Sequence, residues 1–91
     1  MITTVNEMKS YLRVDFDDDD ALLETMIVSA TRLCMDVARM DDEAAFASVP
    51  NARIAVMYAV AYLYEHREEA DHRALTLTLR ALLFGCREGG F

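Results

Sequence analysis

The densest group of side chains that could bind a cation lies near the N-terminus, where Asp15 is followed by four consecutive aspartates at positions 17–20. Asp15, Asp17 and Asp19 have the alternate spacing that opens a calcium-binding loop. Such a loop needs glycine at its sixth position and glutamate at its twelfth, but Asp20 and Met26 stand there. The run instead predicts the start of a helix, because aspartate is favoured at the N-cap and in the first turn.

The other residues that could do chemistry are scattered. His66 and His72 are six positions apart with no cysteine beside them, and Cys34 and Cys86 form no CxxC pair. The one adjacent glycine pair is at positions 89–90, so no glycine-rich phosphate loop is possible. We therefore expect no metal, no cofactor and no catalytic residue, and we expect both thiols to be reduced in a cytosolic protein.

Composition narrows the class of protein. A chain of 91 residues predicts one domain spanning residues 1–91, and 54% hydrophobic residues exclude intrinsic disorder. Its formal charge of −7 argues against a protein that grips phosphate backbones. The longest apolar run, residues 54–64, is shorter than the ~20 residues of a membrane span. A domain this small buries only about 60–65% of its unfolded surface. Part of the apolar content should therefore lie at a subunit interface.

Hydrophobic periodicity predicts an all-α fold, a compact bundle of four helices. A short helix should start after Thr4, which forms a capping box with Glu7, and end near residue 12 or 13. Two long antiparallel helices should cover about residues 19–40 and 50–68, and a short one about residues 78–86. Residues 41–49 form a connector with room for one helical turn at 42–47. The alternation at 74–79 predicts an extended link, and residues 87–91 a flexible tail.

Two of the predicted helices carry more apolar residues than a single core can bury. Val28 and Met35 interrupt the polar face of the second helix and are either two scattered exposed residues or a contact strip for a neighbouring subunit. The third helix is apolar nearly all round, which is typical of a helix facing the core on one side and a partner on the other. The candidate interface residues are Val28, Met35, Met40, Tyr58 and Tyr62.

Three blocks in order resemble the small head–tail connector, or adaptor, proteins of long-tailed bacteriophages and prophages. The first block runs from Met1 to Asp15 and on through the aspartates to Ala21-Leu22-Leu23. The second ends in Tyr64-Glu65-His66-Arg67-Glu68, where the family tends to show Tyr-Glu-x-Arg-Glu. The third is Leu79-Arg80-Ala81-Leu82-Leu83 with Arg87 after it. The chain departs from the family at Leu75-Thr76-Leu77, near a position where the family often has proline.

The resemblance implies a structural protein without catalytic activity. Such protomers form a ring of about twelve or thirteen copies. The ring docks under the phage portal protein, extends the DNA channel and carries the neck or tail completion protein. DNA passes through the lumen without specific binding, and no membrane is involved. The protein would then reside in the virion neck, and in the host cytoplasm during assembly.

In such a ring, acidic side chains facing the lumen would repel DNA and let it slide. The candidates are Asp17, Asp18, Asp19 and Asp20, and the candidates for docking on the portal are Arg87 and Phe91. Two alternatives remain at this stage. A host dimerisation or regulatory module would use the same apolar surfaces, whereas a small helical enzyme would need a pocket where basic groups such as Arg13, Arg32 and Arg39 converge.

Overall fold

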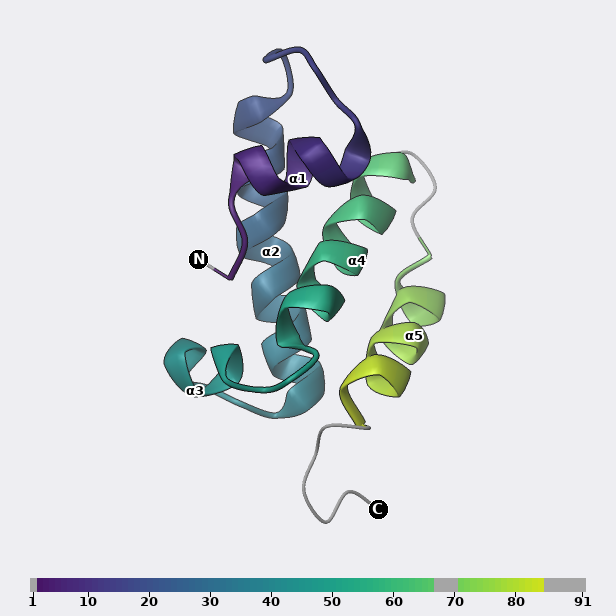
Figure 1. Cartoon of the computed structure of the whole chain (residues 1–91). Coiled ribbons are helices and arrows are strands. Elements are labelled where there is room, and N and C mark those ends of the chain that lie inside the picture. The colour runs from purple at the N-terminus through teal and green to yellow at the C-terminus, as the bar shows by residue number, and fades with distance from the viewer. Residues whose placement is uncertain (1, 67–70, 85–91) are drawn as a thin grey trace.

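The computed structural model describes residues 2–66 and 71–84, and Figure 1 draws the remainder as a grey trace. The helices are α1 (Val5–Leu12), α2 (Asp20–Ala38), α3 (Glu43–Ala47), α4 (Ala52–Glu65) and α5 (His72–Phe84). The all-α prediction is confirmed, with five helices in these residues instead of four, because the connector after α2 forms the short helix α3. The predictions for the tail, Arg87 and Phe91 lie outside the described residues.

The helix ends follow from local chemistry. The capping box of α1 is confirmed: the Glu7 N–H donates to the Thr4 hydroxyl (3.1 Å), and the Thr4 N–H donates to the Glu7 carboxylate (2.9 Å). Helices α1 and α2 both end on an arginine in the left-handed conformation, Arg13 at φ 61° and Arg39 at φ 58°. This conformation favours glycine, because a Cβ atom crowds the following carbonyl.

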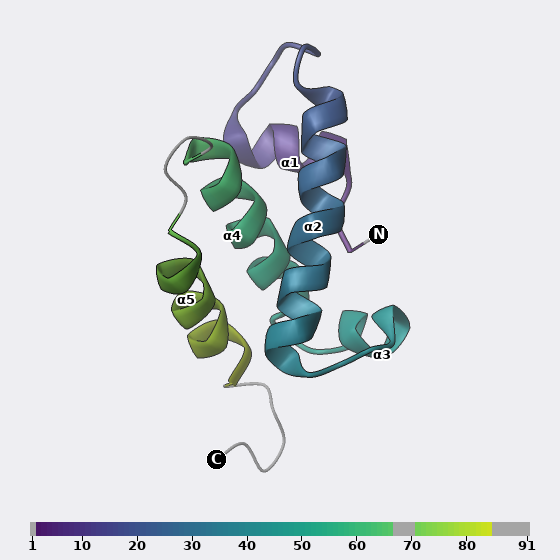
Figure 2. The same cartoon turned by 180° about the vertical axis from the view of Figure 1, so that it is seen from behind.

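Helix α4 lies at the centre of the fold and contacts each of the other four helices. It runs antiparallel to α2 (Figure 1), and α5 packs against both of these helices. Helix α1 crosses near one end of the α2–α4 pair and α3 lies near the other (Figures 1 and 2). The largest fully buried apolar side chains are Met8, Leu23, Ile27, Phe46, Val56, Val60, Leu75, Leu79 and Leu83.

The prediction of an extended link at residues 74–79 is wrong. These residues lie within α5, which begins at His72. Asp71 starts the helix, because its carboxylate accepts a hydrogen bond from the Ala74 N–H (3.0 Å). Leu75 and Leu79 then point into the core one turn apart, whereas Leu77 between them is 55% exposed. The alternation of leucine and threonine therefore conceals a helical spacing.

A side-chain hydrogen bond closes the end of the bundle where α4 begins and α5 ends. The Asn51 amide donates to the Leu82 carbonyl (3.1 Å), and both residues are part-buried. Carbonyls in the last turn of a helix have no partner within the helix, so this bond satisfies one that would otherwise need water. It fixes the C-terminal turn of α5 to the N-terminal turn of α4.

Candidate interaction surfaces

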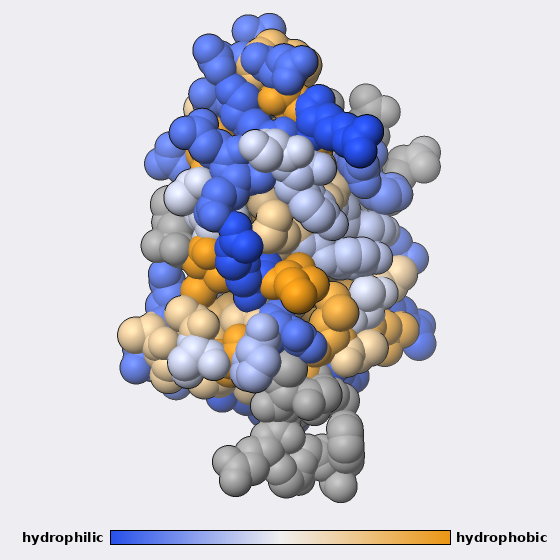
Figure 3. Space-filling model, in the orientation of Figure 1, coloured by the Kyte–Doolittle hydropathy of each residue, from blue (hydrophilic) through white to orange (hydrophobic). Residues whose placement is uncertain are grey.

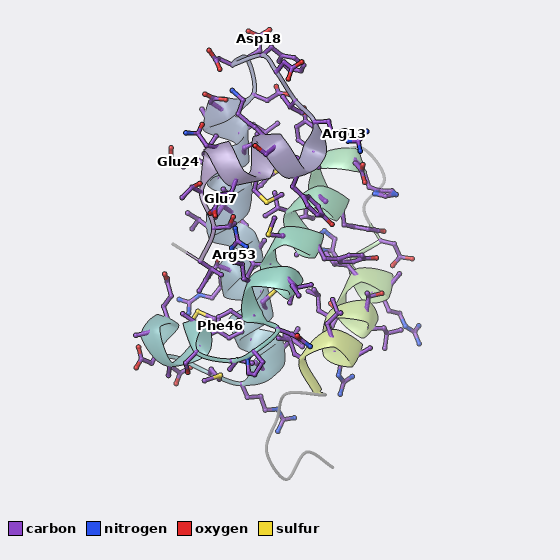
Figure 4. The ribbon with its side chains drawn as sticks, viewed as in Figure 1. Glu7, Arg13, Asp18, Glu24, Phe46 and Arg53 are labelled. Atoms are coloured by element: carbon purple, nitrogen blue, oxygen red, sulfur yellow. The ribbon has the colours of Figure 1, made fainter. Side chains whose placement is uncertain are left out.

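The acidic run forms the loop between α1 and α2, with Asp18 at its tip (Figure 4). Asp19 is the N-cap position of α2, although its side chain makes no capping hydrogen bond. The prediction that the aspartates mark the start of this helix is thus confirmed. The Asp19 carboxylate instead accepts a hydrogen bond from the hydroxyl of Tyr64, which lies in the last turn of α4 (2.6 Å).

Lys9 balances part of this acidic charge. Its ammonium lies 2.5 Å from Asp17 Oδ1 and 3.0 Å from Asp20 Oδ1. The hydrogen bond to Asp17, followed by that to Asp20, raises the pKa of Lys9, and the bond from Lys9 lowers the pKa of Asp17. Of the four predicted lumen residues, Asp17 and Asp20 share the Lys9 ammonium and Asp19 anchors a tyrosine, while Asp17 and Asp18 are exposed. In the described part of the chain, no acidic, histidine or cysteine side chains are grouped as metal ligands.

Glu7 joins the N-terminal segment to α4. Besides capping α1, its carboxylate accepts a hydrogen bond from the buried Thr3 hydroxyl (3.2 Å) and pairs with the guanidinium of Arg53 (Figure 4). The pKa of Glu7 is lowered, chiefly by the Thr4 N–H and then by Arg53 and Thr3, against the opposing effect of desolvation. The capping box was visible in the sequence, but the long-range pair with Arg53 was not.

The first candidate interface lies on the outer face of α2. Val28 is 60% exposed, as predicted, and lies in a shallow hollow whose other lining residues are Ala21, Glu24, Thr25 and Ser29. Met35 adds almost no exposed area to this strip, because it is 5% exposed and belongs to the core, although it lines a second hollow together with Val28. The expected exposure of Met35 is wrong because the chain turns back after α2, so that Asp41 and Glu43 line a hollow together with Met35. Met40 is half-buried against the core.

The second candidate interface lies where α1 meets the C-terminal half of α4. An open hollow of about 470 Å³ is lined by Tyr11, Leu12, Arg13, Tyr58, Ala61, Tyr62, Glu65 and His66. The rim residues Tyr11 and Tyr58 are 53% and 37% exposed. Tyr62 is half-buried because its ring stacks on His66 (centroids 4.2 Å apart) and its hydroxyl accepts from the Asp71 N–H (3.0 Å). Tyr62 thus also holds the start of α5.

Sequence reasoning missed four other exposed apolar side chains: Tyr11, Phe16, Ile54 and Leu77. Figure 3 shows apolar surface over α4, α3 and α5 on the face opposite α2. In the structure, the buried residues Ala55, Val56 and Ala59 lie on the inward side of α4 and place Ile54 away from it. Nearly uniform hydrophobicity hid this direction.

The described residues offer little for catalysis. Cys34 is a free thiol in the core, and burial raises its pKa to about 12, so it stays protonated and unreactive. The arginines considered for anion binding do not converge: Arg13 and Arg32 line different hollows. None of the described helices combines the length and the apolar character needed to cross a bilayer.

Comparison with known proteins adds one finding. A family model described as phage gp6-like head-tail connector protein matches residues 2–85. The match extends over all five helices. Neither the curated proteins nor the solved structures give a significant match.

Proposed function

The chain belongs to the gp6-like head-tail connector family of phages, and we propose that it assembles head to tail into a ring beneath the portal. The connector role is structural. The ring extends the DNA channel below the portal and carries the neck or tail completion protein. This places the protein in the virion neck.

The observation that carries the ring is the presence of two separate candidate interfaces. The hollow around Val28 on α2 and the hollow around Tyr58 on α1 and α4 have no lining residue in common. A two-fold dimer uses one self-complementary patch, whereas a ring joins two different patches on each protomer. Two distinct patches with exposed apolar side chains therefore favour a ring over the dimeric host module considered above.

The acidic loop is our candidate for the channel wall. The single Lys9 ammonium offsets one of the four negative charges at positions 17–20, so three remain on each copy, Asp18 at the exposed tip among them, to supply the field that repels DNA. Such a wall lets DNA slide past without binding it. For docking on the portal we retain Arg87 and Phe91, which lie outside the described residues.

The decisive experiment is negative-stain microscopy of the purified protein, alone and mixed with the portal of the same phage. We expect rings of about twelve or thirteen subunits, coaxial with the portal when it is present. A dimer that persists with the portal would support the regulatory module instead. Protein that stays monomeric and unbound beside assembled portal would contradict the proposal.

A further inference from the structure

We propose that neighbouring copies in the ring join through the outer face of α2 and the tyrosine face of α1 and α4, with Glu24 of one copy paired to Arg13 of the next. This inference rests on the ring proposed above and specifies which surfaces meet. We call the first surface, made by Ala21, Glu24, Thr25, Val28 and Ser29, the α2 face. We call the second, made by Tyr11, Arg13 and Tyr58, the tyrosine face.

The α2 face allows close approach of another chain. Ala21, Thr25 and Ser29 are small and exposed, and Val28 offers apolar area among them. The Thr25 hydroxyl already donates to the Ala21 carbonyl (3.1 Å), so this hydroxyl keeps its partner when the face is covered. Glu24 is the one charged side chain that lines this hollow. The complementary partner therefore has large apolar side chains beside one positive charge.

The tyrosine face offers both large apolar side chains and a positive charge. Tyr11 and Tyr58 stand exposed at the rim of their hollow, and tyrosine is among the residues most enriched at interfaces, because it combines apolar area with a hydroxyl. Arg13 supplies the positive charge. Although Glu65 lines the same hollow, neither Arg13 nor Glu24 forms an ion pair with any described residue. Within the described residues, both charges are thus available for a partner.

The placement of the two charges suits a ring. Glu24 and Arg13 lie at opposite edges of the protomer, at a similar height beside α1 (Figure 4). A second copy set alongside the first in the same orientation therefore brings its Glu24 towards the first copy's Arg13. Repetition of this contact around an axis closes a ring, whereas a two-fold dimer would bring identical faces together.

Charge reversal tests the pairing. Glu24→Arg alone and Arg13→Glu alone each place like charges opposite one another, and each should raise the protein concentration for half-maximal ring formation on the portal about tenfold. The double variant Glu24→Arg/Arg13→Glu restores an attractive pair and should return to within about threefold of the native value. Single variants that assemble like the native protein, or a double variant no better than either single one, would overturn the pairing.

The left-handed backbone of Arg13 provides a second variant that keeps the fold. Glycine suits this conformation, so Arg13→Gly removes the guanidinium without disturbing the end of α1. Arg39→Gly is the matched control, since Arg39 ends α2 in the same conformation but lines neither face. We expect impaired assembly for Arg13→Gly and native assembly for Arg39→Gly. Equal assembly by both would overturn the pairing while leaving the ring intact, and a native protein that forms no ring would overturn both proposals.

Discussion

The Tyr64 hydroxyl of α4 lies 2.6 Å from the Asp19 carboxylate, so the last turn of one long helix is fixed to the start of the other. The two residues are 45 positions apart in sequence, and the bond is part-buried. It also holds one end of the acidic loop against the bundle. The position of this loop in an assembled connector thus depends on a tyrosine far from it in the chain.

Removal of the Tyr64 hydroxyl should destabilise the fold. A hydrogen bond to a charged, part-buried acceptor contributes about 1.5 kcal/mol, so Tyr64→Phe should lower the free energy of unfolding by roughly that amount. Urea denaturation followed by circular dichroism measures the change. Tyr58→Phe is the matched control, because the Tyr58 hydroxyl has no hydrogen bond in the described chain, and it should change stability by less than about 0.5 kcal/mol. Equal effects of the two variants would contradict the assigned role of Tyr64.

The lowered pKa of Glu7 predicts a pH dependence of stability. The folded state holds the pKa of the Glu7 carboxyl below its ordinary value. The contribution of this carboxylate to stability is therefore complete above the unfolded pKa of about 4.3, and it is lost as the pH falls through the lowered folded pKa. Glu7→Gln should therefore be less stable than the native protein at neutral pH and should lose less stability on acidification. Urea midpoints measured across this range test it, with Asp18→Asn at the exposed loop tip as the control. Parallel curves for native and Glu7→Gln proteins would refute the prediction.

Phe46 should be the residue that keeps α3 on the bundle. The helix has five residues, too few to be stable alone, and Phe46 is its one buried side chain. Phe46→Ala should cost about 3–5 kcal/mol, and Phe46→Leu less than about 2 kcal/mol. Hydrogen exchange should show faster exchange of the Phe46 amide, which donates to the Asp42 carbonyl, in the alanine variant. Unchanged exchange there would show that α3 is held by other contacts.

The Cys34 thiol should report on unfolding. With its pKa raised to about 12 and its side chain in the core, it should not react with a thiol reagent while the protein is folded. In a Cys86→Ser background, the labelling rate at mildly alkaline pH should rise with urea in step with the unfolded fraction. Fast labelling of the native protein would show that the core opens locally around α2.

The sequence predicted most helices because their signals are local. The Thr4–Glu7 box set the start of α1, and the aspartates set the start of α2. The first half of α5 was missed because Leu75, Leu77 and Leu79 alternate like a strand, although Leu75, Leu79 and Leu83 also repeat at helical spacing. The hydrophobic pattern of this short segment was compatible with both a strand and a helix, and packing against α2 and α4 favours the helix.

The candidate surfaces were less predictable, because exposure depends on tertiary contacts. Val28 and Met35 lie on the same face of α2, yet Val28 is exposed and Met35 is buried. The difference arises because the chain turns back after α2 and brings Asp41 and Glu43 close to Met35. The contacts of Glu7 with Arg53 and of Asp19 with Tyr64 join residues more than forty positions apart. Neither spacing nor residue type indicates such pairs in a single sequence.

The hydrogen bond from Asn51 to Leu82 has a mechanical consequence. Residues 85–91 follow in the sequence directly after the helix turn that this bond secures. Tension applied through those residues would reach the start of the central helix at once, without first peeling α5 from its neighbours. A pull on the last residues of a protomer would thus load α4 together with α5.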